Sequence, residues 1–322
     1  MAQTRKWRYG KKRWVVFGLI GLNILAVNLF PPVTPHIAVS PEKIMHDPLF
    51  TLPVLGNFYL INTLVAMLLV DLVLVVMALS ARRAMSGGSL VPGGFASAIE
   101  ALLEAIYNLT ESSAGKYTRK IFPLFATIVL MVLVANLISL VPGVDSIGVV
   151  EPLEHGYPIQ EVMPGVVTLV ATDVDEPGYH IAPFVRALAT DLNFTLGLAL
   201  IAVVMTQVIG VQANGAGFFL RYFNVRTLFT KPGFGAIDLG VSILELISEF
   251  SKLLSFSFRL FGNIFAGAVL LFLVGTLLPV FAQTLVLLFK FFIGIIQAFV
   301  FGMLTMVFMA QATRAHGEEE HH

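Results

Sequence analysis

Six long apolar stretches leave this chain few ways to fold other than across a lipid bilayer. A spanning helix needs about 20 apolar residues, and the stretches cover about residues 14–31, 57–80, 121–142, 193–214, 239–278 and 284–312. Only 12% of the residues are charged, whereas about a quarter are charged in a soluble domain. The sequence therefore predicts an all-α membrane protein with about six hydrophobic helices. The last two stretches exceed one crossing and predict a long, tilted C-terminal helix hairpin.

Composition excludes several classes of function. The formal net charge is zero and no segment is a basic domain, so nothing indicates binding to nucleic acid. The absence of cysteine rules out disulfides and cysteine-ligated zinc or iron–sulfur clusters. The histidines of the predicted outer loops lack the spacing of metal ligands. We therefore expect no metal and no cofactor.

The distribution of basic residues predicts the orientation of the helices. With the N-terminus inside, four segments face the cytoplasm, and they are residues 1–13, 81–120, 215–238 and 313–322. They hold 15 of the 20 Lys and Arg residues, whereas the outer segments hold only Lys43 and Arg186. Because basic residues favour the cytoplasmic side, both termini are predicted to be cytoplasmic.

The chain is predicted to fall into three parts. Residues 1–56 hold a basic segment, the first hydrophobic helix and an outer loop, residues 57–314 form the membrane domain, and residues 315–322 are a polar tail. The first helix has a basic start and a short apolar core, which also describe a signal peptide. Because no small-residue cleavage site precedes Pro31, we favour a retained helix.

Two polar segments interrupt the membrane domain. Within residues 84–120, apolar residues recur at helical spacing and acidic residues occupy the other face. This pattern predicts an amphipathic helix on the cytoplasmic membrane surface. The outer loop 143–192 is rich in acidic residues and proline. We interpret it as a solvated loop, and a second interpretation is an acidic funnel that concentrates cations.

A stripe of polar residues runs along the fifth apolar stretch. Its members are Glu245, Ser248, Glu249, Lys252, Ser255, Arg259 and Asn263. Apart from one adjacent pair they are three or four residues apart, which places side chains on one helix face. At 1.5 Å per residue the stripe is about 27 Å long, close to the thickness of the hydrocarbon core. Charged residues inside a span are costly, so the stripe predicts a function.

Arg259 is the strongest candidate in the stripe. An arginine does not lose its charge in a protein, and no acidic residue lies within one turn of it on the same helix. Its counter-charge is therefore predicted to come from another chain, or to be present only intermittently. Gln297, near the middle of the sixth stretch, is a predicted neighbour of Arg259 in an antiparallel helix pair. For the uncharged polar residues, hydrogen bonding between helices is an alternative interpretation.

Three segments resemble subunit a of F-type ATP synthases. The run FRLFGNIFAGA (258–268) is similar to the family's signature around its essential arginine, and IIQAFVFGMLTMVFM (295–309) is similar to its glutamine-bearing helix. PFVRALATDLN (183–193) resembles the segment that opens the corresponding helix. The segments have the order and topology of that family, and the resemblance covers roughly residues 50–314.

The resemblance implies translocation of an ion, with the proton as the expected cargo, in the membrane sector of a rotary ATP synthase. The implied partners are a ring of c subunits, the b subunits of the peripheral stalk and the lipid bilayer of the cell inner (plasma) membrane. No soluble small-molecule substrate is expected besides the ion, and ATP itself would react elsewhere in the complex. Arg259 would face the ring and separate two half-channels. Further implied ion-pathway positions are Glu245, Lys252, Ser255, Asn263, Gln297 and Asn136, and Glu249 joins them because it opens inward beside Glu245.

The outer half-channel is where the chain departs from the family. Ala268 stands where the family commonly has a carboxylate or histidine, Lys290 where it often has histidine or glutamate, and Ser139 where relatives are frequently acidic. We hypothesise that Lys290, Asp191 or Asp71 takes over, or that water alone fills the passage. Asp71 is otherwise expected to pair with a cation inside the fold.

Two other classes of function compete with this interpretation. A stand-alone ion channel or secondary transporter would favour internal repeats or paired broken helices, and the sequence has no convincing repeat. A structural membrane anchor would explain the apolar composition but would leave Arg259 without a role.

Overall fold

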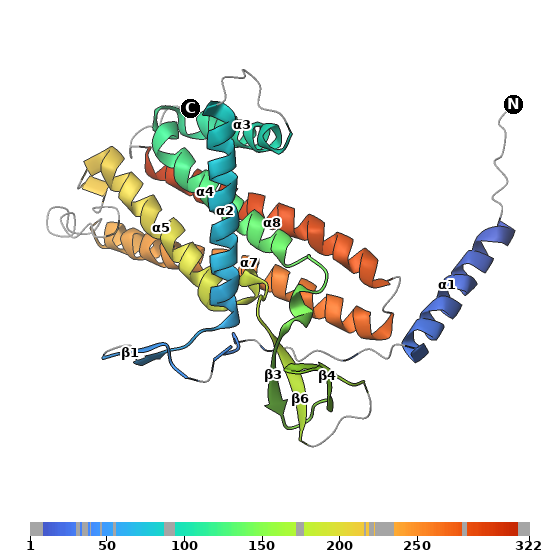
Figure 1. Ribbon diagram of the computed structural model, residues 1–322. Coiled ribbons are helices and arrows are strands. Elements are labelled where there is room, and N and C mark those ends of the chain that lie inside the picture. Colours follow the sequence, from blue (N-terminus) through green and yellow to red (C-terminus); the bar gives the residue numbers. More distant parts are fainter. Residues whose placement is uncertain are drawn as a thin grey trace, which may run out of the picture. The chain divides into compact units, whose positions relative to one another are not determined.

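The computed structural model shows a mostly helical chain (Figure 1). It describes residues 9–29, 33, 38, 40–45, 47–53, 56–86, 94–171, 177–215, 217–218, 222, 235–278 and 282–314. The principal apolar helices are α2 (Asn62–Ser86), α4 (Thr118–Ile138), α5 (Leu192–Asn214), α7 (Gly235–Leu277) and α8 (Ala282–Ala312). Within these described residues, five candidate spans are long and apolar enough to cross a membrane, one of them running from α3 into α4. The predicted all-α membrane class is confirmed.

The first apolar stretch also forms a helix, α1 (Tyr9–Leu29). Its apolar part, Val16–Leu29, is shorter than the other candidate spans and than the about 20 residues that a crossing needs. Most of its large apolar side chains are exposed, including Trp14 and Phe17. The polar tail 315–322 lies outside the described residues.

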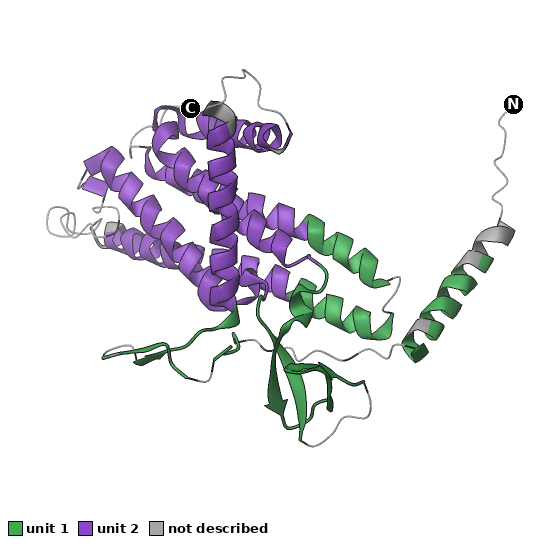
Figure 2. Ribbon diagram, in the orientation of Figure 1, with its two compact units in different colours: residues 1–62, 142–185, 266–292 green, residues 63–141, 186–265, 293–322 purple. Residues whose placement is uncertain are grey.

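The chain divides into two compact units (Figure 2). The first, here called the sheet unit, comprises residues 1–62, 142–185 and 266–292. The second, here called the helix unit, comprises residues 63–141, 186–265 and 293–322. The boundary passes through α7 and α8, so each of these helices contributes to both units.

The sheet unit contains three two-stranded antiparallel sheets. Their strands are β1 (Phe50–Leu52) with β2 (Gly56–Phe58), β3 (Gly148–Leu153) with β6 (Gly178–Pro183), and β4 (Ile159–Met163) with β5 (Val166–Leu169). Most of these strands lie in the segment predicted to be a solvated loop. Valine is frequent there, and β-branched side chains favour strands. Glu42 ties this part together: its Oε1 lies 3.5 Å from Nε2 of His180 on β6, and its Oε2 accepts from Asn62 Nδ2 at 3.4 Å.

The helix unit is built around a core shared by α4, α5, α7 and α8. Its buried side chains include Ile128, Val132, Leu198, Ala202, Phe256, Leu260, Ala298 and Phe301. α4 and α8 approach closely at Gly302. A Cβ atom added there would lie 2.2 Å from Val129 Cγ2 and 2.9 Å from Phe125 Cε2. Only glycine therefore fits at this point of contact.

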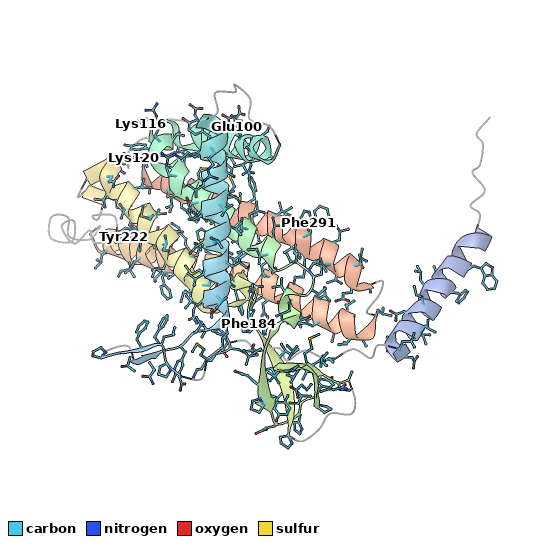
Figure 3. All side chains as sticks on the ribbon, viewed as in Figure 1. Glu100, Lys116, Lys120, Phe184, Tyr222 and Phe291 are labelled. Atoms are coloured by element: carbon cyan, nitrogen blue, oxygen red, sulfur yellow. The ribbon has the colours of Figure 1, made fainter. Side chains whose placement is uncertain are left out.

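The predicted amphipathic helix is α3 (Phe95–Ala114), joined to α4 by the short helix η1 (Gly115–Tyr117). Its apolar face is covered by protein: Ile106 is buried in a cluster with Phe125 on α4 and Met306 on α8. Exposed Glu100 lies on its polar face, at the same end of the helix unit as Lys116 and Lys120 (Figure 3). The periodicity showed that one face needs an apolar partner, but it did not reveal that this partner is α4 and α8.

Candidate functional site

The polar stripe and the buried residues of α7 lie on opposite sides of the helix. On one side, Phe256, Leu260 and Ile264 are buried in the shared core. Ser257 on the same side is also buried, and its Oγ lies 3.1 Å from Thr195 Oγ1 of α5. On the other side, the exposed members of the stripe are Ser248, Ser255, Arg259 and Asn263. Packing of the back of the helix therefore holds these four side chains away from the core.

Arg259 is the charged residue on this exposed side. Its Nη2 donates to Ser255 Oγ at 3.2 Å, one turn earlier on the helix. Among the residues that the structure describes, no carboxylate pairs with it, and Asp71 pairs with neither Arg259 nor Lys252. The helix thus presents a permanent cation whose side chain is free to meet a negative charge from outside the helix unit.

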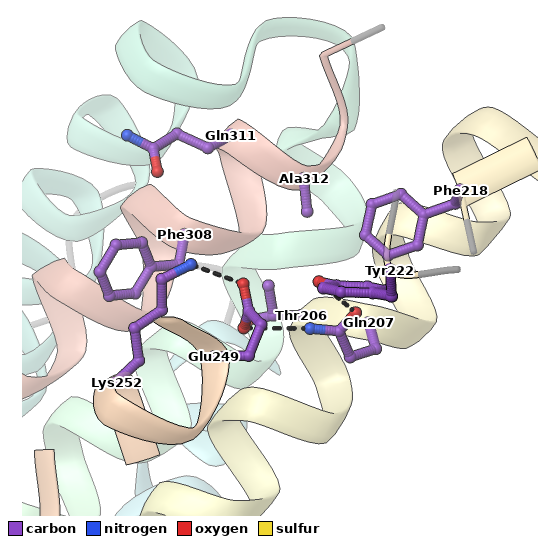
Figure 4. A pocket seen from close by; sticks show the side chains of 9 residues that line it. All are labelled: Thr206, Gln207, Phe218, Tyr222, Glu249, Lys252, Phe308, Gln311 and Ala312. Atoms are coloured by element: carbon purple, nitrogen blue, oxygen red, sulfur yellow. Dashed lines mark hydrogen bonds and ion pairs between the residues drawn. The ribbon is translucent and has the colours of Figure 1, made fainter. Parts of the chain in front are cut away.

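The carboxylates of the stripe are half-buried on α7 and lie closer to its N-terminal end. Glu249 Oε1 accepts from Lys252 Nζ at 2.6 Å, and Oε2 accepts from Gln207 Nε2 of α5 at 3.1 Å. Tyr222 in turn donates to Gln207 Oε1 at 3.0 Å. These residues border a cavity of about 30 Å³ (Figure 4). The charge of Lys252 is therefore neutralised locally, unlike that of Arg259.

Gln297 and Asn136 lie on the helices that support α7. Asn136 of α4 is buried, and its Nδ2 donates to the carbonyl oxygen of Gly294 on α8 at 3.0 Å. Gln297 follows one turn later and is half-buried. Next to it, Ala298 shares the core with Leu260, the neighbour of Arg259. The structure thus brings the glutamine-bearing segment of α8 to the arginine-bearing segment of α7.

Comparison with known proteins shows which family the chain belongs to. Residues 63–310 match the family described as ATP synthase A chain, which is more than half of the chain. The chain belongs to this family. The ATP synthase subunit a of Halorhodospira halophila is 32% identical over 188 residues, 58% of each chain. That of Campylobacter jejuni subsp. doylei is 30% identical over 201 residues, 61% of this chain and 65% of the relative.

Coverage differs among these relatives. A subunit a from a Bradyrhizobium species is 27% identical over 233 residues, 71% of this chain and 73% of the relative. The chain spans less than two thirds of the length of the first two relatives. Membership of the ATP synthase A chain family and the long apolar helices make the chain a multi-pass membrane protein.

Asp191 has a clear structural position in this member of the ATP synthase A chain family. It caps the N-terminus of α5: Oδ1 accepts from the backbone N–H of Asn193 at 2.9 Å. Oδ2 accepts from Thr63 Oγ1 of α2 at 2.9 Å, and Asp191 is buried. An N-cap carboxylate satisfies backbone donors that the helix leaves open. A further role of Asp191 in the ion pathway stays a prediction.

Lys290 lies in the sheet unit, where 6% of its surface is exposed. Its aliphatic stem packs beside Gly267, since a Cβ atom added at Gly267 would lie 3.3 Å from Lys290 Cγ. Asp145, in the short helix η2 (Val144–Ser146), interacts with it electrostatically. This end of α8 thus holds a buried lysine with an acid nearby.

Sequence reasoning missed Gln207, Tyr222 and Asp145 as parts of these clusters. Gln207 is a polar residue within an apolar span, which is a signal for an intramembrane contact that could have been used. Tyr222 follows α5 in a segment without a regular pattern, and Asp145 was one of many acids in the outer loop. Nothing in their local sequence indicates their partners.

Proposed function

We propose that this chain translocates ions, with the proton as the expected cargo, as subunit a of a rotary F-type ATP synthase. The observation that carries the proposal is the exposed Arg259, whose charge no carboxylate of the described residues neutralises. A permanent cation on a membrane-spanning helix is costly unless a negative charge reaches it. A ring of c subunits, each bringing an ionisable carboxylate past α7, would supply that charge repeatedly.

In this proposal Arg259 separates two half-channels. Glu245 and Glu249 serve the inner one, and groups beyond the arginine serve the outer one. A fixed cation repels a proton that would pass directly between the two half-channels. The ion therefore has to be carried from one to the other by the rotor. Moving one elementary charge across 100 mV releases about 2.3 kcal/mol, and several such steps per turn would supply the energy for making ATP.

The exposed side of α7 would form the interface with the ring. Large apolar side chains flank its polar residues, among them Leu244, Ile247 and Phe258. The other proposed partners are the b subunits of the peripheral stalk. In this proposal the membrane is the plasma membrane and both termini are cytoplasmic, an orientation that the distribution of basic residues supports.

Reconstitution distinguishes a stator subunit from a stand-alone channel. Vesicles that contain only this chain are expected to show no proton conductance above that of protein-free vesicles. Vesicles that also contain the c-ring are expected to conduct when a membrane potential is applied. The measurement is the quenching of a pH-sensitive dye after a potassium diffusion potential is imposed. Conductance by the chain alone would overturn the proposal in favour of a channel or transporter.

For the outer half-channel we propose Lys290, together with Asp145. Lys290→Met keeps an unbranched stem beside Gly267 but removes the charge and the exchangeable proton. We expect ATP-driven pumping to fall by at least about tenfold, because positioned proton-transfer groups contribute about 10²–10⁴-fold. Initial pumping rates in inverted vesicles measure the effect.

Lys290→Arg separates two versions of this role. Arginine keeps the positive charge but does not deprotonate. Full pumping by Lys290→Arg with loss in Lys290→Met means that the lysine acts as a fixed charge, and loss in both means that it carries the proton. Full pumping in both variants would exclude Lys290 from the outer passage.

A further inference from the structure

A cavity in the helix unit is bordered by polar residues that do not all belong to the stripe. It lies between the C-terminal parts of α5 and α8 and the N-terminal half of α7, and Gln207, Tyr222, Glu249, Lys252 and Phe308 border it (Figure 4). Its volume is about 30 Å³. A cavity needs about 10–15 Å³ by this measure to hold one water, together with two to four polar partners. This cavity meets both conditions.

The hydrogen bonds around the cavity form a chain of donors that ends at the Glu249 carboxylate. The Tyr222 hydroxyl donates to Gln207 Oε1, which orients the amide so that Nε2 donates to Glu249. The other carboxylate oxygen accepts from Lys252 Nζ at 2.6 Å. Glu249 is therefore held from α5 by an uncharged donor and from its own helix by a cation.

Lys252 has a second contact that holds it when the carboxylate changes charge. Its Nζ lies 4.7 Å from the ring centroid of Phe308 on α8. A cation over an aromatic face is stabilised by the ring's quadrupole. The other acid nearby is Glu245, one turn earlier on α7, and the lining residues from α5 and α8 are uncharged. Glu249 is thus the titratable carboxylate that borders the cavity.

The position of Tyr222 follows from a glycine of α5. A Cβ atom added at Gly210 would lie 2.4 Å from the Phe218 ring, so this ring lies directly on the bare helix backbone. Phe218 then meets Tyr222 edge to face, with ring centroids 6.1 Å apart, and both pack with Ala312 at the end of α8. This packing brings the Tyr222 hydroxyl to Gln207.

We propose that the cavity is a water site through which the inner half-channel exchanges protons with the cytoplasm, with Glu249 as its proton carrier and Gln207 as its positioning residue. This inference rests on the proposed function. A proton that leaves a rotor carboxylic acid passes through water to the Glu249 carboxylate and weakens its ion pair with Lys252. The neutral acid then gives the proton to the cavity water, and the ion pair forms again. Only O–H bonds form and break, and no redox partner is needed.

Exchanging the two side chains across the 3.1 Å contact tests the proposal. Glu249→Gln removes the carboxylate, and we expect passive proton conductance of vesicles with the c-ring to fall about 100-fold or more, the lower end of the range for a proton-transfer group. Adding Gln207→Glu returns one carboxylate and one amide to the same cavity. We expect this double variant to recover about half or more of the lost conductance, because the relay requires a carboxylate at the cavity rather than on one particular helix.

Controls make each outcome decisive. Ser112→Ala changes an exposed hydroxyl on α3, outside the cavity and the proposed interface, that donates to the Leu109 carbonyl, and it is expected to conduct normally. Copurification of the c-ring shows that each variant assembles. Normal conductance by assembled Glu249→Gln, or no recovery in the assembled double variant, would overturn the water site. If Arg259→Ala still blocks pumping in that case, the inference fails while the proposed function stands.

Discussion

Arg259→Ala is expected to abolish ATP-driven ion pumping while the complex stays assembled. The side chain leaves from the exposed side of α7, and the packing of Leu260 and Ile264 on the other side is unchanged. Because no carboxylate of the described residues pairs with Arg259, its removal leaves no buried acid without a partner. The loss should exceed about 100-fold, the effect of removing one preorganised hydrogen-bond donor from a reacting site.

Pumping is measured in inverted membrane vesicles, and copurification of the c-ring confirms assembly. Leu200→Ala is the control, since Leu200 is an exposed apolar residue of α5 and is not part of the proposed interface on α7. Arg259→Lys is expected to restore little, because lysine replaces the planar guanidinium by a point charge that can be neutralised. Normal pumping by Arg259→Ala would mean that the stripe is structural, and the half-channel mechanism would have to be abandoned.

Gly302→Leu is expected to prevent α8 from packing on α4. Its Cβ atom alone would lie 2.2 Å from Val129 Cγ2, and Phe125 behind it is fully buried. Overpacking a core costs about 1–3 kcal/mol and occasionally more. Leucine adds three further carbons beyond Cβ, and no free volume is left for them at this contact. We expect a large loss of folded chain from the membrane, measured as the amount that copurifies with the c-ring and as a lower Tm in detergent.

A second substitution that removes the clashing atom tests whether this contact causes the loss. Val129→Ala removes the atom nearest to the added Cβ, so Gly302→Ala is expected to be tolerated better with Val129→Ala than without it. Gly197→Leu on α5 is the control, because a Cβ atom at Gly197 meets nothing within 4 Å. Equal tolerance of leucine at positions 302 and 197 would contradict the close contact between α4 and α8.

The helices could be predicted from the sequence because lipid imposes one simple requirement. An apolar run long enough to cross becomes a helix, so the stretch 121–142 corresponds to Thr118–Ile138 and 193–214 to Leu192–Asn214. The strands of the outer loop were not predicted, since short strands depend on partners distant in sequence. β3 pairs with β6, and Gly148 lies opposite Pro183 across a long connection.

The site could be predicted only in part for a related reason. Spacing placed Lys252 and Arg259 in one stripe, but spacing does not show which members of a stripe meet other side chains of the same protein. The sequence does not indicate which edge of the stripe packs against other helices. The structure turns Lys252 toward Glu249 and Phe308, whereas Ser255 and Arg259 stay exposed. Gln207 shows the same limit, because its partner lies 42 positions away in the chain.

The different exposure of Lys252 and Arg259 also shapes the energy profile that a moving partner would meet. Between residues 240 and 263, Arg259 is the charged member of the described exposed side of α7, because Lys252 is half-buried and neutralised by Glu249. A carboxylate sliding along this surface would encounter one attractive well with uncharged flanks. Two exposed cations would instead create two wells about 10 Å apart at 1.5 Å per residue. A single well gives the rotor one resting position for each c subunit. The number of rotation steps per turn would then equal the number of subunits in the ring.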